Sequence, residues 1–391
     1  MNILIVPSWY PDKENTNWGY GQINGSFFLE QAHELNKIVN TQIVYIKVHS
    51  LRKMKLKNLI NFFSISWDLE NGIRTFRLNT FNFLPGSTTG LLLQYKVISF
   101  LVFRFLSLSK KFDLPDVVHC HGSFFGGAVG IYASKFFKKK LIFTEHSRQL
   151  TDYLLPKEVN YYKSLLKNSS KVIALSNDFR NYFRESYHIN NNKIEIVPNM
   201  IPRIFIDHDH RVFQKNKTFT FIFIGMLIDL KKPLDIIKAF SKINQSGIDS
   251  QLKIIGVGNQ YSKCNTLVNE LSLNDRVRFF GTLSRENTLK EIAKSHCLCS
   301  VSTTESFGMS ILEALTLGLP VISTKSGGPQ DLVNNKNGLL VDIGDIDGIA
   351  DAMTYIFNNY NNFNSDYIRD DALKRFHPNV VSNKLISIYQ K

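Results

Sequence analysis

The sequence predicts an α/β protein in which two doubly wound parallel-sheet domains face each other across a cleft. Its 391 residues exceed the ~250–300 residues at which single hydrophobic cores stop growing. Short β-branched runs alternate with helical segments along the chain, which is typical of parallel sheets covered by helices on both faces. Pro198-Asn199 and Pro202 interrupt this alternation and divide it into two series.

The first series, residues 1–200, predicts the first domain. The expected strands are Ile3–Val6, Gln42–Val48, Ile73–Leu78, Val117–Cys120, Leu141–Thr144, Val172–Leu175 and Ile194–Val197. The expected helices are Phe27–Asn36, Leu91–Lys111, Ala128–Phe137 and Glu158–Leu166. Gln94, Lys96 and Arg104 interrupt the apolar run from Leu91 to Leu108, whereas a spanning helix needs ~20 mostly apolar residues. We therefore expect an amphipathic helix there.

The second series, residues 201–370, predicts the second domain, and residues 371–391 are expected to form a helix that packs back toward the first. The expected strands are Thr218–Ile224, Leu252–Ile255, Val277–Phe280, Leu298–Val301, Val321–Ser323 and Gly338–Val341. Open parallel sheets bind ligands beyond the carboxyl ends of their strands. The loops that follow the strands are therefore where we expect the functional residues.

The composition is that of an ordinary globular protein. Hydrophobic residues make up 43% and charged residues 20% of the chain, which argues against disorder or a fibrous repeat. The four cysteines form neither a disulfide framework nor a metal-ligand pattern. Met1–Pro7 has neither the basic region nor the long apolar run of a signal peptide. These features predict a cytoplasmic protein.

Positive charge is concentrated in the first half of the chain. The net charge is +14, and residues 1–200 hold 25 basic and 14 acidic side chains. The stretch Arg52–Lys57 is either a basic segment that lies on anionic lipid or a solvated loop. Lys138–Lys140 closes a helix, where cations suit the helix dipole. We expect a negatively charged partner on this side, with peripheral contact to an anionic membrane as one candidate.

The densest group of candidate functional residues begins at Ser302, where a strand ends and a helix follows. Glu305 precedes this helix and Glu313 lies inside it. The amides of Phe307, Gly308 and Met309 are first-turn donors without helical partners, which suits phosphate or sugar oxygens. The ordinary alternative is one carboxylate favoured by the helix dipole and another that is merely solvated.

Taken together, these residues resemble the family-four retaining glycosyltransferases of the GT-B fold. The resemblance rests on Glu305 and Glu313 separated by seven residues, on Gly318-Leu-Pro320-Val, and on Gly327-Gly328. It extends to Phe223-Ile-Gly225-Met-Leu with Lys231-Lys-Pro downstream. The N-terminal segment from Pro7 to Ala32 is similar to the opening loop of bacterial polysaccharide members.

The resemblance implies a donor site in the second domain. Glu313 would bind the ribose of a nucleotide sugar, and Glu305 would hold the donor sugar hydroxyls together with Ser306 and the amides of Phe307 to Met309. Lys231, near Gly225, would pair with the diphosphate. Family members commonly carry Arg where this chain has Met226, so Lys232 or Arg203 would assist Lys231. The backbone of Gly25 and Ser26 would offer donors to the phosphates from the first domain.

The resemblance also implies a first-domain contribution. His121, after the strand Val117–Cys120, would lie beside the reacting sugar, whereas His119 is expected to be a satisfied residue of the sheet. Glu145 and His146, after the next strand, would line the acceptor side. The cluster Asp207–His210 has metal-ligand composition but lies in the linker, so we expect a solvated loop.

The implied activity is a retaining transfer of a hexose unit from a nucleotide-diphosphate sugar to a glycan or a polyprenyl-linked glycan in surface polysaccharide synthesis, without cofactor or metal. Alternatives are an inactive relative and a basic protein that binds nucleic acid or membrane. A nicotinamide-dependent enzyme is disfavoured because Gly256-x-Gly258 is not a complete Gly-x-Gly-x-x-Gly turn. Nucleic-acid binding is disfavoured because the basic residues form no recognised module.

Overall fold

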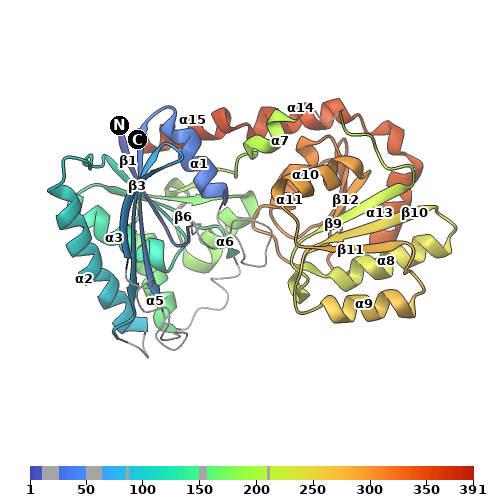
Figure 1. The fold of residues 1–391 in the computed structure, drawn as a ribbon, viewed down its shortest axis with the longest axis horizontal. Helices are drawn as coiled ribbons and strands as arrows, with labels where there is room; N and C mark the ends of the chain where they lie inside the picture. Colours follow the sequence, from blue (N-terminus) through green and yellow to red (C-terminus); the bar gives the residue numbers. More distant parts are fainter. Residues whose placement is uncertain (11–25, 50–63, 85–87, 149–155, 209–211) are drawn as a thin grey trace.

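Two sheets, one entirely and one mostly parallel, are flanked by helices and form the two halves of the molecule (Figure 1). The computed structural model describes residues 1–10, 26–49, 64–84, 88–148, 156–208 and 212–391. The eight-stranded sheet has the order β3-β4-β2-β1-β5-β6-β7-β8, and the six-stranded sheet has the order β11-β10-β9-β12-β13-β14. The predicted α/β class with two doubly wound domains is confirmed.

The first sheet contains all seven strands expected from residues 1–200 and one more. Its strands are β1 (Asn2–Pro7), β2 (Asn40–His49), β3 (Ser64–Glu70), β4 (Ile73–Phe81), β5 (Val117–His121), β6 (Lys140–Thr144), β7 (Lys171–Ala174) and β8 (Ile194–Ile196). The additional strand, β3, pairs antiparallel with β4. The turn between them is Asn71-Gly72, and both residues have positive φ, as a two-residue hairpin requires.

Helices cover both faces of the first sheet. They are α1 (Ser26–Asn36), α2 (Thr88–Ser107), α3 (Phe125–Phe137), α5 (Pro156–Asn168) and α6 (Asn177–Tyr187). Gly126 lets the start of α3 lie directly on the sheet, because a Cβ there would come within 2.6 Å of the carbonyl oxygen of His121 and 2.7 Å of the amide nitrogen of Ser8. Close helix contact therefore supports the carboxyl end of β5.

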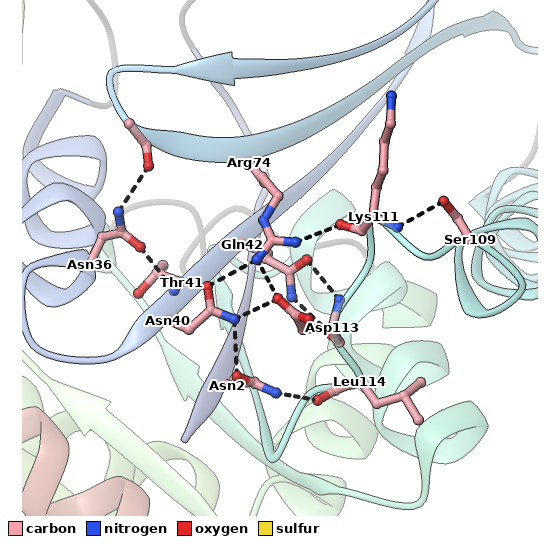
Figure 2. A network of polar contacts seen from close by, with 11 residues as sticks. Asn2, Asn36, Asn40, Thr41, Gln42, Arg74, Ser109, Lys111, Asp113 and Leu114 are labelled. Carbon is pink, nitrogen blue, oxygen red and sulfur yellow. Dashed lines mark hydrogen bonds and ion pairs between the residues drawn. The ribbon is translucent and has the colours of Figure 1, made fainter.

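A polar network fixes the opposite, amino-terminal edge of the first sheet (Figure 2). The guanidinium of Arg74 forms an ion pair with Asp113 and donates to the carbonyl of Lys111 at 2.7 Å. The side-chain amides of Asn40 and Gln42 donate to the carboxylate and the carbonyl of Asp113 at 2.8 and 2.9 Å. These bonds fasten the chain just after α2 to β2 and β4.

The second sheet and its helices follow a short linker helix, α7 (Arg203–Asp207). The strands are β9 (Phe219–Ile224), β10 (Ser250–Ile255), β11 (Val277–Gly281), β12 (Cys297–Ser300), β13 (Val321–Thr324) and β14 (Gly338–Val341). The helices are α8 (Pro233–Gln245), α9 (Tyr261–Glu270), α10 (Arg285–Lys294), α11 (Met309–Thr316), α12 (Pro329–Leu332) and α13 (Ile346–Asn358). All strand pairs in this sheet are parallel.

The chain ends in two helices rather than the single one expected for residues 371–391. Helix α14 (Ser365–Phe376) packs on α11 in the second domain, and α15 (Pro378–Gln390) packs on α1 in the first. Pro378 at the first turn of α15 suits a helix start but not a continuation of α14. Leu385 and Ile388 of α15 are buried in the core of the first domain.

Candidate active site

The loops at the carboxyl ends of the two sheets meet at Ser306. The backbone amide of Arg148, beyond β6, donates to the hydroxyl of Ser306 at 3.0 Å. The hydroxyl of Ser176, after β7, donates to the carbonyl of Ser306 at 3.0 Å. The structure therefore brings the two sets of predicted loops into contact.

The donor loop, residues 301–308 between β12 and α11, owes its shape to three glycines. Gly308 caps α11 with φ of 106°, a backbone conformation that L side chains rarely adopt. Gly327 has φ of 110°, and a Cβ on Gly328 would collide with the backbone of Phe307. The amide of Glu305 donates to the carbonyl of Ser326, and the amide of Gly328 donates to the carbonyl of Glu305, both at 2.8 Å. The Gly-Gly turn thus holds the donor loop in place.

Lys231 and Glu305 form an ion pair in which each side chain is about one-fifth exposed. Lys231 ends a short 3-10 turn after β9, and Thr303 of the donor loop bonds the carbonyl of the neighbouring Leu230. Gly225 lies beside the aliphatic part of Lys231, because a Cβ there would be 3.7 Å from its Cγ. Three predicted donor-site residues therefore occupy one cluster, and an anionic ligand would compete with Glu305 for the lysine.

The other residues expected near the diphosphate have different surroundings. Lys232 follows Lys231 directly and caps α8 in a left-handed conformation. Met226 follows Gly225, and its carbonyl accepts from the amide of Ile228. Arg203 makes two 2.9 Å hydrogen bonds to the buried carboxylate of Glu34 on α1. It therefore links the linker to the first domain.

Glu313 is engaged by Arg285, a residue that the sequence analysis missed. Arg285 begins α10, after β11, and lies 3.6 Å from the carboxylate of Glu313 and 2.7 Å from that of Glu30 on α1. Burial raises the pKa of Glu313 to about 7, although Arg285 lowers it, and the charge of Glu30 raises it further. Burial also raises the pKa of Glu30. The rule that places ligands after strands could have pointed to Arg285.

A cavity of about 570 Å³ adjoins this contact. Glu30 and Glu34 of α1, Arg203 of the linker, and Arg285 and Glu286 of α10 line it. Leu29, Met200, Ile201, Ile204 and Pro378 also line it, so its wall is largely apolar and carries charged groups of both signs.

Three histidines lie at the carboxyl ends of β5 and β6; His119 and His121 are fully buried and His146 is partly buried. Nδ1 of His121 is 2.9 Å from Nε2 of His146, and the ring centroids of His119 and His121 are 4.1 Å apart. Burial lowers the pKa of His121 to about 3, and it lowers the pKa values of His119 and His146 well below the usual range. All three rings are therefore neutral near pH 7 and act through hydrogen bonds.

His119 and His121 differ in how their ring nitrogens are used. His119 lies 2.6 Å from the hydroxyl of Tyr389 and 2.7 Å from that of Thr144, so both its nitrogens are bonded. Among the described residues, Nε2 of His121 is buried without a hydrogen-bond partner. Burying an unbonded polar atom costs about 1–3 kcal/mol, which favours a partner supplied by a ligand.

Glu145 lies beside this cluster and is fully buried. Its carboxylate accepts from the backbone amides of His146 at 2.8 Å and Ser147 at 3.3 Å. Burial raises the pKa of Glu145 to about 7 against the effect of those hydrogen bonds. The predicted acceptor-side pair, Glu145 and His146, is therefore adjacent to His121.

Some predicted residues lie outside the described part of the chain. Gly25 and the basic stretch Arg52–Lys57 are among them, as are residues 209–210 of the linker cluster. Ser26 is the first residue of α1. In the described segments, no group of three His, Cys, Asp or Glu side chains could hold a metal ion.

This fold and this convergence of strand-end loops are those of a two-domain glycosyltransferase. Residues 205–371 match the family model for group 1 glycosyl transferases, and residues 70–203 match the model for glycosyltransferase family 4. The chain belongs to the family 4 glycosyltransferases, and the resemblance seen in the sequence is confirmed.

Relatives and solved structures agree with this assignment. The chain is 26% identical over 316 residues to N-acetyl-alpha-D-glucosaminyl L-malate synthase of Bacillus anthracis, covering 76% of this chain and 80% of that one. It is 32% identical over 143 residues to lipopolysaccharide 1,6-galactosyltransferase of Escherichia coli, covering 35% and 39%. The Anabaena protein HepE, solved in complex with UDP, shares the fold at a TM-score of 0.72 and 16% identity, with 100% of both chains covered.

Proposed function

We propose that the protein is a retaining glycosyltransferase that moves a hexose unit from a nucleotide-diphosphate sugar to a glycan or a polyprenyl-linked glycan in surface polysaccharide synthesis. The observation that carries the proposal is the Lys231–Glu305 ion pair, held beside the amides that open α11 with Glu313 further along the same helix. Solved neighbours of the same fold bind UDP and UDP-glucose, which supports a nucleotide-sugar donor.

The ion pair suits a donor that carries both phosphates and hydroxyls. A diphosphate would take the ammonium of Lys231, since charge-assisted hydrogen bonds to phosphate are the strong ones. Glu305 would then be left to accept hydrogen bonds from the sugar hydroxyls, while the amides of Phe307 to Met309 add donors. Glu313 would accept from the ribose hydroxyls. The carboxylates are thus assigned to binding, not to the nucleophile and acid roles of a glycosidase.

The first domain would supply neutral contacts to the sugar. His121 has one buried ring nitrogen without a partner in the described chain, and its ring stays uncharged near pH 7 because burial lowers its pKa to about 3. In the proposal this nitrogen bonds the donor sugar, and Glu145 with His146 lines the acceptor side. The backbone of Ser26, the first residue of α1, would add a donor to the phosphates, as would Gly25, which lies outside the described residues.

The proposed chemistry is a front-face displacement. The bond between the anomeric carbon and the leaving phosphate oxygen breaks, and a bond to the acceptor oxygen forms on the same face. The acceptor proton passes to the departing phosphate. Lys231 and the α11 amides would stabilise the charge that develops there, so the proposal includes no divalent metal and no cofactor. Its cellular setting in this proposal is the cytoplasm, at the inner face of the plasma membrane.

Nucleotide binding and product stereochemistry test the proposal. We expect one of UDP, GDP and ADP to raise the melting temperature, because binding at about 100 times Kd adds about 2.7 kcal/mol to the free energy of unfolding. Transfer from the matching sugar nucleotide should give a product with the donor's anomeric configuration by NMR. An inverted product contradicts the retaining mechanism, and binding without transfer to any acceptor indicates an inactive relative. NAD should give no shift.

A further inference from the structure

The outward face of α2 is apolar. Residues 88–108 have nine exposed positions, spaced three or four apart so that they form one face: Thr89, Leu93, Lys96, Val97, Phe100, Leu101, Arg104, Phe105 and Leu108. Six of these are large hydrophobic residues, and each is more than half exposed. A helix on a water-exposed surface normally turns its apolar stripe inward and its polar face outward. Here the solvent-facing side is largely apolar as well.

Large hydrophobic side chains are also exposed in the chain on either side of α2. Phe83 and Leu84 precede α2 and are 63% and 43% exposed, and Leu114 follows it at 60%. Single exposed hydrophobic residues are normal, but a contiguous patch marks a site that contacts a protein or a membrane. We call the exposed side chains of residues 93–108 the α2 face.

The charges around the α2 face indicate whether it contacts a protein or a membrane. Residues 88–112 contain no Asp or Glu. Lys96 and Arg104 lie within the face, and Lys110 and Lys111 are exposed just beyond its end. Long basic side chains beside an apolar stripe reach lipid phosphates while their stems stay among apolar groups. A second copy would be a poor occupant, because a two-fold contact brings the same cations together.

The helix is held in place and cannot leave the fold. Among the described helices, α2 alone is long and apolar enough to cross a membrane. Its other side, however, packs against the first domain, where Tyr95, Phe103 and Leu106 are buried. The side chain of Gln94 also forms hydrogen bonds with the backbone of Phe81 and Phe83. The network around Arg74 fixes the chain after its last turn (Figure 2). A helix held this way can lie in a membrane surface but not span it.

We propose that the α2 face docks the first domain on an anionic lipid bilayer. The helix lies in the plane of the interface, with Leu93, Val97 and Leu101 among the acyl chains and Lys96 and Arg104 at the lipid phosphates. This deepens the proposed function, because a polyprenyl-linked acceptor is presented from the same bilayer. Helix α2 lies at the edge of the first domain that is farthest from the second (Figure 1), so docking leaves the second domain free to move.

Cosedimentation with lipid vesicles tests the docking surface. Vesicles of phosphatidylcholine with phosphatidylglycerol should bind the full chain, and the triple variant Leu93→Ser, Val97→Ser, Leu101→Ser should bind at least about tenfold more weakly. The matched control, Ile38→Ser, Val212→Ser, Ile343→Ser, removes the same number of comparably exposed aliphatic side chains elsewhere and should bind like wild type. Equal binding by both triple variants overturns the proposal.

The charge contribution is tested separately. Lys96→Gln with Arg104→Gln should lower binding to anionic vesicles, whereas Lys163→Gln with Lys167→Gln, an exposed pair on α5, should have no effect. Equal losses in the two pairs mean that only bulk charge acts, and the proposal fails. A wild-type dimer that the triple serine variant converts to monomers, without vesicle binding, also overturns it.

Nucleotide-induced thermal stabilisation separates this inference from the proposed function. The triple serine variant should respond to nucleotide like wild type. If wild type responds to nucleotide but does not bind vesicles, the docking surface is wrong and the transferase stands. If wild type binds vesicles but no nucleotide stabilises it, the proposed function is wrong.

Discussion

The two sides of the site are built in opposite ways. On the first domain, His121 and Glu145 are buried and His146 is partly buried. Desolvation lowers the pKa values of the two histidines and raises that of the Glu145 carboxyl. On the second domain, Lys231 and Glu305 are partly exposed and paired with each other. The histidines of one side are therefore neutral near pH 7, and the other side holds opposite charges that a ligand can separate.

The difference suits the proposed donor, which carries both charged phosphates and neutral hydroxyls. Charged side chains that face a ligand need to keep their charge, and pairing them avoids the cost of desolvating each one alone. Hydroxyls, which carry no charge, can also be bound by neutral nitrogens held in fixed positions, such as those of the histidine rings.

The largest effect is expected from the charged side. Glu305→Ala and Lys231→Ala should each lower kcat/KM by about 100-fold or more, because they remove preorganised charge beside the reacting group. Glu291→Ala is the matched control, since Glu291 forms a 2.6 Å ion pair with Lys253 in the same domain and is 19% exposed, like Glu305. Steady-state kinetics measure the effect. If Glu305→Ala keeps more than about a tenth of wild-type turnover, the assigned role is wrong.

Substitutions on the histidine side of the site should lower turnover but leave the affinity for the nucleotide unchanged. His121→Asn should lower kcat by about tenfold, the equivalent of one lost hydrogen bond of about 1.4 kcal/mol. Its Kd for the nucleotide, measured by calorimetry, should stay near wild type, whereas Lys231→Ala should weaken it. His296→Gln changes a buried neutral histidine elsewhere and controls for stability. A weakened nucleotide Kd in His121→Asn would remove the distinction between the two sides.

A pH shift is expected where the two sides touch. Glu313 is protonated below about pH 7, because burial raises its pKa to about 7, so nucleotide affinity should rise with pH through that value. Glu30→Gln removes a negative charge that raises this pKa, and Arg285→Met removes a positive charge that lowers it. The midpoint of affinity against pH should move down in the first variant and up in the second, by about half a unit.

The nucleotide itself also titrates, but it does so equally with both variants. The difference between their two midpoints of affinity against pH therefore reports the pKa of Glu313. Shifts in the same direction, or an affinity that does not depend on pH in either variant, would mean that Glu313 does not contact the nucleotide.

The smallest effect on catalysis is expected from Arg203→Met. Burial raises the pKa of Glu34, but hydrogen bonds from Arg203 and Lys37 outweigh it and lower the pKa to about 2. A lowered carboxyl pKa stabilises the fold above the unfolded value near 4.5, and this stability is lost as the pH falls toward 2. The variant should lose about 2 kcal/mol in urea unfolding at pH 7, with turnover unchanged. The difference from wild type should shrink below pH 4.5, and a constant difference would contradict the assignment.

The sequence predicted the sheets well because their strands are buried, apolar and short. Strand β3 was missed because Ser64–Glu70 lies at the edge of the sheet and is largely exposed, so burial imposes no apolar pattern on it. The Asn71-Gly72 turn was the available signal, since Asn-Gly favours a two-residue hairpin.

The shape of the donor loop was predictable from the sequence because glycines fix its backbone. The donor loop needs Gly308, Gly327 and Gly328 at backbone positions that exclude other residues. These required glycines form a motif that can be recognised in the sequence. The contact of Arg285 with Glu30 joins residues 255 positions apart. A pairing of that kind leaves no local pattern and became visible only in the fold. The exposed apolar side of α2 could not be predicted for a related reason. Apolar residues occur on both faces of this helix, so the sequence alone does not show which face is buried.

The return of α15 to the first domain has a consequence for how the protein folds. The side chains of Val381, Leu385 and Ile388 complete a core built around β1 and α1, and the hydroxyl of Tyr389 bonds His119 beside His121. During synthesis, residues 1–200 emerge from the ribosome without this cover. The first domain therefore cannot reach its native core until the second has been made, and an excised N-terminal half would expose an apolar surface and an incomplete histidine cluster.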